Sequence, residues 1–243
     1  MVVVVPYHHT IWHQQQRSSP FTMTEPIVES FGVPPLGCNC TIIGDPVSKD
    51  CCVVDPGGDV AKIQARIASH QLTLKRCLIT HGHLDHIMGA TELKKATGCD
   101  IIIHQDDLGL YERVAAQCHD FGIPPPPSPL ARPDAFCADQ DVLQWASSYT
   151  VQCLHCPGHT PGSTSFYFPE ANLVCPGDTL FRGSVGRTSW YGLPSLQGTS
   201  DAQQLKGSIQ FKLMTLPPNT KVVAGHGEST TIEHEQRHNI FIR

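Results

Sequence analysis

A dense group of metal-binding residue types constrains what this chain can fold into. Residues 81–86 read HGHLDH, four candidate ligands within six positions, and they directly follow the apolar run 76–80. Imidazole and carboxylate groups together suit a divalent transition metal at neutral pH. His81 and His83 would lie on opposite sides of a helix, so their spacing favours a loop. Such a loop, leaving a buried strand, can point all four side chains into one pocket.

Three more candidate ligands occur far downstream, each at the end of an apolar segment in a loop that contains glycine. His159 lies in CPGHTPG, Asp178 in PGDTL and His226 in AGHG. Five histidines and two aspartates in such settings predict a two-metal centre to which distant segments converge. The alternative is that residues 81–86 form a polar surface turn, which would leave the later motifs without a common explanation.

Composition describes an ordinary globular protein. The chain has 243 residues, of which 40% are hydrophobic and 16% charged, enough for one substantial core. The formal net charge is −5 and no block of lysine or arginine occurs, so we expect no nucleic-acid partner. The apolar run 2–5 is far shorter than the roughly 20 residues that span a bilayer, so we expect no membrane partner.

Cysteine usage points to a reducing compartment. Eleven cysteines, an odd number, are spread through apparent strands of a chain too long to need disulfides. We therefore expect free, buried thiols and a cytoplasmic protein. The short patterns C-x-C at 38–40 and C-x-x-C at 153–156 are interpreted as small core side chains, because neither has a second pair to complete a zinc site.

The first 25 residues differ from the rest and are rich in His, Gln and Ser. They lack the basic start and cleavage site of a secretory signal. We interpret residues 1–25 as an N-terminal extension, either disordered or an added segment, with a mitochondrial or plastid transit peptide as the alternative. Residues 26–243 are predicted to form one domain.

Short apolar runs alternate with helical patterns along that domain, which predicts an α/β sandwich with sheets inside and helices outside. The predicted strands are 41–44, 51–55, 75–80, 101–103, 149–155, 164–168, 172–175 and 221–224. The predicted helices are 59–70, 87–97, 105–120, 201–215 and 230–239, the last one capped by Thr230 or Thr231. The proline-rich segment 122–129 is predicted to be an extended surface loop, with a substrate entrance as the alternative role.

The ordered motifs HxHxDH, HTPGS, GDTL and GHG closely resemble those of the metallo-β-lactamase fold hydrolases. Residues 179–188 (TLFRGSVGRT) and the pattern TTI…RHN at 230–239 are similar to the glyoxalase II branch in its compact form, which lacks a C-terminal helical domain. The resemblance covers residues 27 to about 242. It implies a four-layer αβ/βα sandwich with the metal site at one edge of the two sheets.

The resemblance also implies a ligand set and a cofactor of two divalent metal ions. It assigns the ligands in three sets: His81, His83 and His159 for one metal, Asp85, His86 and His226 for the other, and Asp178 bridging both. Zinc is expected, with iron or manganese as alternatives, because the same nitrogen and oxygen ligands accept all three. A hydroxide bridging the metals would attack the substrate, and Asp85 would help to orient it.

The activity implied is hydrolysis of a small-molecule thioester of the S-D-lactoylglutathione type, as in hydroxyacylglutathione hydrolases. Arg182 and Arg187 are the nearest candidates for binding a substrate carboxylate, by position alone. The chain departs from its compact relatives at Ser189, where they commonly have Asp, and at Glu228, where the family commonly has Pro.

The sequence is also compatible with other functions. A mononuclear iron persulfide dioxygenase of the same fold could use His81, His159 and Asp178, although those relatives usually have Cys where Val185 stands. Lactones, β-lactams or other acyl esters are alternative substrates. Residues 234–238 (HEQRH) match the zinc-protease signature H-E-x-x-H, but their polar flanks favour a solvated helix. A non-enzymatic binding module would be expected to lose ligands, and none is missing.

Overall fold

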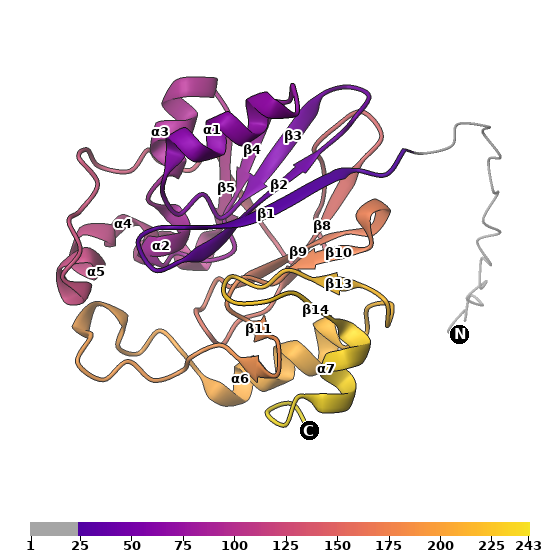
Figure 1. The fold of residues 1–243 in the computed structure, drawn as a ribbon. Helices are drawn as coiled ribbons and strands as arrows, with labels where there is room; N and C mark the ends of the chain where they lie inside the picture. The colour runs from indigo at the N-terminus through magenta and orange to yellow at the C-terminus, as the bar shows by residue number, and fades with distance from the viewer. Residues whose placement is uncertain (1–23) are drawn as a thin grey trace, which may run out of the picture.

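The computed structural model describes residues 24–243, which fold into two facing β-sheets with helices on the outer face of each (Figure 1). The first sheet has the strand order β1-β2-β3-β4-β5-β6. Its strands are β1 (Ile27–Val33), β2 (Cys38–Gly44), β3 (Asp50–Val54), β4 (Thr73–Leu78), β5 (Asp100–His104) and β6 (Ala135–Cys137). Neighbouring strands pair antiparallel from β1 to β3 and parallel from β3 to β6.

The second sheet has the order β14-β13-β10-β9-β8-β7. Its strands are β7 (Val142–Gln144), β8 (Thr150–His155), β9 (Thr164–Phe168), β10 (Leu173–Cys175), β13 (Lys221–Val222) and β14 (Thr230–Thr231). A separate small hairpin pairs β11 (Leu180–Phe181) with β12 (Ser184–Val185). Strands β8, β10 and β13 run in the same direction, because β9 is antiparallel to both β8 and β10, and β13 is parallel to β10.

Helices cover the outer face of each sheet (Figure 1). On the first sheet these are α1 (Val60–Ser69) and α3 (Ala90–Thr97). On the second they are α6 (Ala202–Ser208), its π-helical continuation (Ile209–Leu213) and α7 (Ile232–His238). Three further helices, α2 (Leu84–Ile87), α4 (Leu108–Glu112) and α5 (Val114–Phe121), lie near one edge of the two sheets. The predicted four-layer αβ/βα sandwich is confirmed.

The central strands are apolar on both faces, which is why their sequences read as continuous hydrophobic runs. Ile101 and Ile103 of β5 pack in the cluster under α1 and α3, whereas Ile102 packs between the two sheets. On β10, Leu173 packs between the sheets and Val174 packs under α6 and α7. Successive side chains of a strand point to opposite faces, so each strand supplies two of the three core layers.

The predicted strands agree with the structure to within a few residues, but several helices differ. The segment predicted as one helix over 105–120 is a 3₁₀ turn followed by α4 and α5, with Arg113 between the two helices. Helix α3 begins at Ala90 instead of residue 87, and residues 84–87 form the one-turn helix α2 instead of a loop. Thr231 caps α7 as expected, accepting a hydrogen bond from the His234 amide.

Strands β1, β6, β7 and β14 and the β11–β12 hairpin were not predicted. All of these except β1 have two or three residues, too few for an alternating pattern to be visible. Of the N-terminal segment, residues 1–23 lie outside the described residues. Thr24 contacts the hydroxyl of Tyr149 through both its backbone carbonyl and its side chain.

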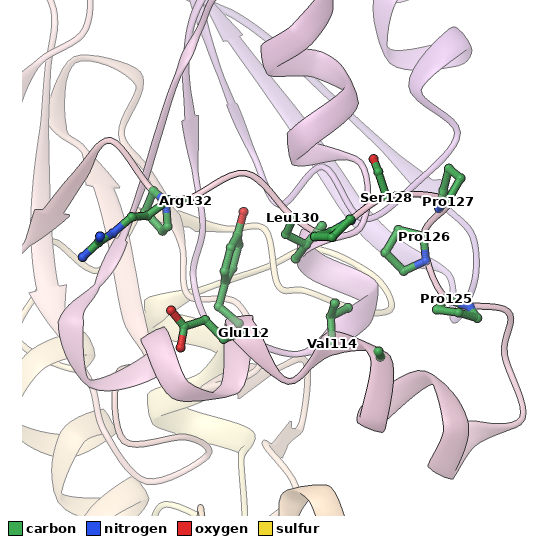
Figure 2. Close-up of a pocket in the computed structure, with 12 residues that line it drawn as sticks. Glu112, Val114, Pro125, Pro126, Pro127, Ser128, Leu130 and Arg132 are labelled. Carbon is green, nitrogen blue, oxygen red and sulfur yellow. The ribbon is translucent and has the colours of Figure 1, made fainter.

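The proline-rich segment is an extended surface loop, as predicted. It lines a cavity of about 620 Å³ against α4 and α5 (Figure 2). The loop is held by hydrogen bonds at Ala131, whose carbonyl accepts from the Tyr111 hydroxyl at 2.9 Å and whose amide donates to Thr91 at 2.7 Å. None of the residues that line this cavity is one of the seven candidate ligands, so the prolines do not line the candidate site.

All eleven cysteines, which lie within the described residues, are buried and free. Burial raises the pKa of most of these thiols, for example to about 12 for Cys156. Within residues 24–243, no helix combines the length and apolar character needed to span a bilayer.

Candidate metal centre

The seven candidate ligands meet at one edge of the sandwich because their strands end there. His81 follows the carboxyl end of β4, and the other ligand loops follow β8, β10 and β13. Since β8, β10 and β13 run in the same direction, His159, Asp178 and His226 reach the same edge of the second sheet. The first sheet contributes the remaining ligands, His81, His83, Asp85 and His86, from one loop and its short helix α2.

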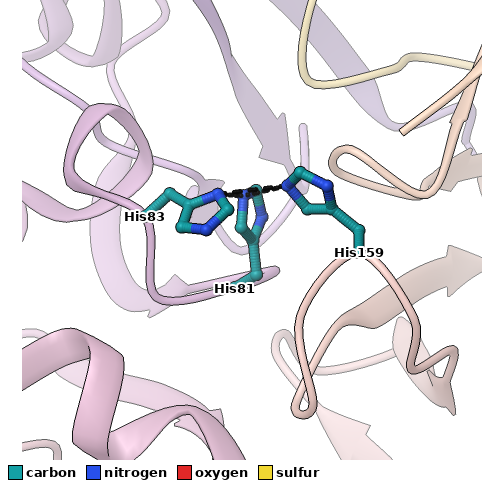
Figure 3. A group of neighbouring side chains, drawn as sticks. All are labelled: His81, His83 and His159. Carbon is teal, nitrogen blue, oxygen red and sulfur yellow. Dashed lines mark hydrogen bonds between the residues drawn. The ribbon is translucent and has the colours of Figure 1, made fainter. Parts of the chain in front are cut away.

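Three histidines converge on one point (Figure 3). In this three-histidine group (His81, His83 and His159), Nε2 of His81 lies 3.0 Å from Nδ1 of His83 and 3.3 Å from Nε2 of His159. Nδ1 of His83 lies 3.1 Å from Nε2 of His159. Zn–N bonds of about 2.0–2.1 Å in tetrahedral geometry place ligand nitrogens about 3.3 Å apart. The three nitrogens are therefore spaced as ligands of one ion.

The protonation of these rings also fits a cation. Nδ1 of His159 donates to the carbonyl of Arg187 at 2.8 Å, so its Nε2 carries a lone pair. Thr80 Oγ1 donates to Asp55 and lies 3.0 Å from Nδ1 of His81, so it accepts from that nitrogen and leaves Nε2 of His81 with a lone pair too. Two facing lone pairs cannot hydrogen bond to each other, whereas a metal ion satisfies both.

Burial keeps the three-histidine group uncharged. Desolvation lowers the pKa of His81 and of His83 well below the usual range, and neighbouring histidines add to the effect. Desolvation likewise lowers the pKa of His159, although Asp178 opposes it. Neutral imidazole is the form that ligates a metal.

Asp85, His86 and His226 form a second group, here called the carboxylate group. Oδ2 of Asp85 lies 3.1 Å from Nε2 of His226 and 3.7 Å from Nε2 of His86. Burial raises the pKa of Asp85, but His86 and His226 outweigh that effect and lower it below the usual range. Asp85 is therefore an ionised, buried carboxylate at neutral pH.

Asp178 lies between the two groups. Its Oδ1 is 3.5 Å from Nε2 of His86, and its Oδ2 is 3.6 Å from Nε2 of His159 and 3.7 Å from Nε2 of His226. Oδ1 of Asp178 and Nε2 of His86 are buried and have no hydrogen-bond partner in the described part of the chain. Buried polar atoms without partners are costly, and a cation between them would remove the cost. The seven residues are thus compatible with a binuclear metal site.

Three groups that orient the histidines were not identified from the sequence. Asp55, at the end of β3, contacts Nδ1 of His86 at 2.9 Å. Thr80 and the carbonyl of Arg187 hold His81 and His159, as described above. Partners of this kind fix the ring orientation of metal-binding histidines. Of these three groups, only Asp55 has a signal in the sequence, because it is an acidic residue directly after an apolar strand. A carboxylate in that place is expected to be buried and therefore to need hydrogen-bond partners.

A pocket of about 280 Å³ opens above the candidate ligands. Its apolar wall consists of Leu36, Leu84, Phe121, Phe181, Trp190 and Leu196. The indole of Trp190 packs edge-on against the rings of His83 and His159, with centroids 5.0 and 5.5 Å apart.

The structure separates the two candidate arginines. Arg187 lines the pocket, with its guanidinium 5.1 Å from the centre of the Trp190 ring and its Nε donating to the carbonyl of Ser189. Arg182 is ion-paired with Glu228 and is absent from the pocket lining. The chain departs from its compact relatives at Ser189 and Glu228. Ser189 contacts Arg187, and Glu228 contacts Arg182.

The H-E-x-x-H motif lies on α7, away from the pocket lining. His238 is exposed and His234 is partly exposed, but Glu235 is fully buried. Its carboxylate accepts hydrogen bonds from Thr230, the Gly183 amide and Asn239 at 2.7–2.9 Å. Glu235 therefore connects α7 to the β11–β12 hairpin. Because its carboxylate is buried and engaged in these hydrogen bonds, it cannot serve as the catalytic base of a zinc-protease site.

Comparison with known proteins shows which family this chain belongs to. A protein identified as the hydroxyacylglutathione hydrolase GloC of Haemophilus influenzae is 35% identical over 216 residues, which cover 88% of this chain and 97% of the relative. The crystal structure of the B3 metallo-beta-lactamase BLEG-1 superposes with a TM-score of 0.78 at 29% identity, covering 89% of this chain and 99% of that one. TTHA1623, in a di-iron-bound form, gives a TM-score of 0.74 at 33% identity, covering 88% and 100%.

The family model described as the metallo-beta-lactamase superfamily matches residues 33–226. This range includes all seven candidate ligands and the strands that carry them. The chain therefore belongs to the metallo-beta-lactamase superfamily, as a metallo-hydrolase.

Proposed function

We propose that this hydrolase cleaves thioesters of the S-D-lactoylglutathione type. The observation that carries the proposal is the placement of Arg187 at an apolar pocket whose floor holds His83, His159, Asp85, Asp178 and His226. Within residues 24–243, Arg187 forms no ion pair, so its charge is available to an anionic substrate. The similarity to a hydroxyacylglutathione hydrolase over most of both chains supports this choice.

The three-histidine group would hold one divalent ion, the carboxylate group a second, and Asp178 would bridge them. Zinc fits these ligands, with iron or manganese as alternatives. When bound, such a pair supplies an acidified water and a Lewis acid for the substrate carbonyl. Asp85, ionised and buried beside His226, would accept a hydrogen bond from the attacking water. This contact would orient the water so that a lone pair on the water oxygen points toward the substrate carbonyl. A thiolate leaves readily, so no strong general acid is required.

The pocket would hold only the acyl end of such a substrate. Its volume of about 280 Å³ lies near the lower limit of small-molecule sites, so a glutathione-sized leaving group would extend outward past Arg187. The indole of Trp190 supports the guanidinium and holds it at the pocket. A bidentate contact between Arg187 and a substrate carboxylate would fix the thioester over the ligands.

The test is thiol release from S-D-lactoylglutathione by protein of known metal content, with and without a chelator. We expect hydrolysis to depend on metal, to be lost in His226→Ala, and to be retained in His119→Ala, a control whose side chain is 90% exposed. Lactones, β-lactams and glutathione persulfide, the last monitored by oxygen consumption, are run in parallel. A fully metal-loaded protein that hydrolyses lactones or β-lactams, or oxidises the persulfide, but leaves the thioester intact would overturn the proposal.

A further inference from the structure

Two buried polar side chains beside the metal centre are not candidate ligands. Asp107 ends the 3₁₀ turn after β5, and Gln117 lies on α5. Both are fully buried, and both contact the backbone of the loop that carries His81 and His83. Burying a carboxylate is costly unless it is well hydrogen-bonded, so its contacts indicate what it stabilises.

Asp107 connects the two loops that carry the three-histidine group. Its Oδ2 accepts from the Gly82 amide at 2.7 Å, between His81 and His83. The same oxygen accepts from Thr160 Oγ1 at 2.7 Å, and Oδ1 accepts from the Gly162 amide at 2.6 Å. Thr160 directly follows His159 in the chain. One carboxylate thus fixes the distance between loops that are nearly 80 residues apart in sequence.

Gln117 completes the support on the first loop. Its Oε1 accepts from the Leu84 amide at 3.0 Å, and its Nε2 donates to the carbonyls of Gly82 and Leu110 at 2.9 and 2.8 Å. The backbone on both sides of His83 is therefore held by side chains from the segment 105–121. A ligand held from both sides loses little further freedom when it binds a metal.

The glycines of both loops are required for this approach. A Cβ at Gly162 would lie 2.6 Å from the Asp107 nitrogen and 2.8 Å from its Cβ. A Cβ at Gly82 would lie 2.8 Å from Cβ of Leu110. Cβ atoms essentially never lie this close to other heavy atoms. The glycines within the HGH and HTPG motifs therefore allow the segment that begins at Asp107 to pack directly against both ligand loops.

We infer that Asp107 is a positioning residue that sets the geometry of the three-histidine group and hence its affinity for metal. The inference rests on the proposed metal centre. Three donors converge on the carboxylate, and an ionised carboxylate accepts from all of them. An asparagine amide cannot, because its NH₂ group would face at least one of the donors. Neither Asp107 nor Gln117 contacts Asp85 or His226, so the effect should be confined to one of the two sites.

The test is titration of metal-free protein with Zn²⁺ or Co²⁺ in competition with a chelator of known affinity. Loss of an outer partner typically weakens metal binding about 10- to 100-fold, and we expect a loss of this size at one site of Asp107→Asn. The matched control is Asp100→Asn, the same chemical change at an exposed position of β5 that belongs to no group of possible metal ligands, and this variant should bind both ions as the wild type does. Thermal unfolding of the metal-free proteins checks that both variants are folded.

A second pair of variants keeps the inference testable if Asp107→Asn does not fold. Thr160→Val removes one donor to Asp107 at nearly constant volume, and Thr160→Ser keeps it. We expect weaker metal binding in the valine variant and recovery in the serine variant, a pattern that general loss of packing would not give. Equal affinities in wild type, Asp107→Asn and Thr160→Val would overturn the inference, whereas a wild-type protein that binds no ion would overturn the metal centre itself.

Discussion

The carboxylate of Asp55 lies 2.9 Å from Nδ1 of His86, and both side chains are almost completely buried. The same carboxylate accepts from the amide and the hydroxyl of Thr80, at 2.8 and 2.7 Å. Asp55 therefore fixes the start of the ligand loop and the orientation of one of its histidines, so that Nε2 of His86 faces Asp85 and Asp178.

Replacing Asp55 should therefore weaken the carboxylate group. In Asp55→Asn we expect about 10- to 100-fold weaker binding of one metal, because the NH₂ group of the amide would face at least one of the three donors, the Thr80 amide, the Thr80 hydroxyl or Nδ1 of His86. Chelator competition measures the effect, and Asp50→Asn, a partly exposed position on the same strand, is the control. Unchanged affinity in Asp55→Asn would show that His86 does not need this partner.

Asp178→Asn should lower turnover and metal occupancy together. The carboxylate lies between both groups, and an amide lacks the charge and the second acceptor oxygen that a bridge needs. We expect a larger loss than the 10- to 100-fold typical of an outer partner. Metal analysis of the purified variant, paired with its rate of thioester hydrolysis, measures both. Full activity with full metal content would argue against the bridging role.

Replacing Arg187 and replacing Arg182 should have very different effects on KM. Arg187→Ala is expected to raise KM for an anionic thioester about 10-fold or more, with a smaller effect on kcat, because it removes a binding contact away from the reacting carbonyl. Arg182→Ala should change KM little, since its partner is Glu228. Kinetics with a carboxylate-bearing thioester and an uncharged analogue separate the two effects. An equal rise in KM for both substrates in Arg187→Ala would point to altered pocket shape instead of lost charge.

His234→Ala should leave hydrolysis nearly intact, because His234 is absent from the pocket lining. Glu235→Ala, by contrast, should lower the free energy of unfolding by about 2–3 kcal/mol, since it removes a buried carboxylate that accepts from Thr230, Gly183 and Asn239. Activity assays and denaturant unfolding test the pair. A strong loss of activity in His234→Ala would favour a role for the H-E-x-x-H motif.

Asp134 should contribute pH-dependent stability. Burial raises its pKa, but hydrogen bonds from the Ile101 amide and from Lys94, at 2.8 and 2.6 Å, outweigh that and lower it overall. A carboxyl group whose pKa is lower in the folded protein than in the unfolded chain stabilises the fold when it is ionised. This stabilisation is fully present above the unfolded-state pKa of about 3.9, and it is lost as the pH falls through the folded-state pKa.

Wild type should therefore exceed Asp134→Asn in stability by about 1 kcal/mol at pH 7. The difference should be constant above about pH 5 and shrink below about pH 4. Urea unfolding across this range measures it, with Asp100→Asn, an exposed position nearby, as the control. A difference that does not change with pH would mean that the carboxylate charge is not involved.

The sequence alone determined the layered α/β architecture. Strands buried on both faces appear as apolar runs such as residues 101–103, and amphipathic helices appear as spaced apolar positions such as those in 59–70. These signals are local and were correct within a few residues. The candidate ligands could also be selected, because HGHLDH and the glycine-bearing loops around His159, Asp178 and His226 follow apolar segments. Their convergence was predicted from these shared settings and from the family resemblance, and the structure brings the seven residues together.

Only the tertiary structure decided which residues support the ligands and form the pocket. Asp55, Asp107 and Gln117 act through backbone and side-chain contacts between segments far apart in sequence, and no spacing rule reveals such contacts. The choice of Arg187 over Arg182 likewise depended on Glu228, whose pairing with Arg182 requires the folded chain. Local sequence specifies periodicity and chemical type, whereas the partner of a buried polar group is set by the packing of the whole domain.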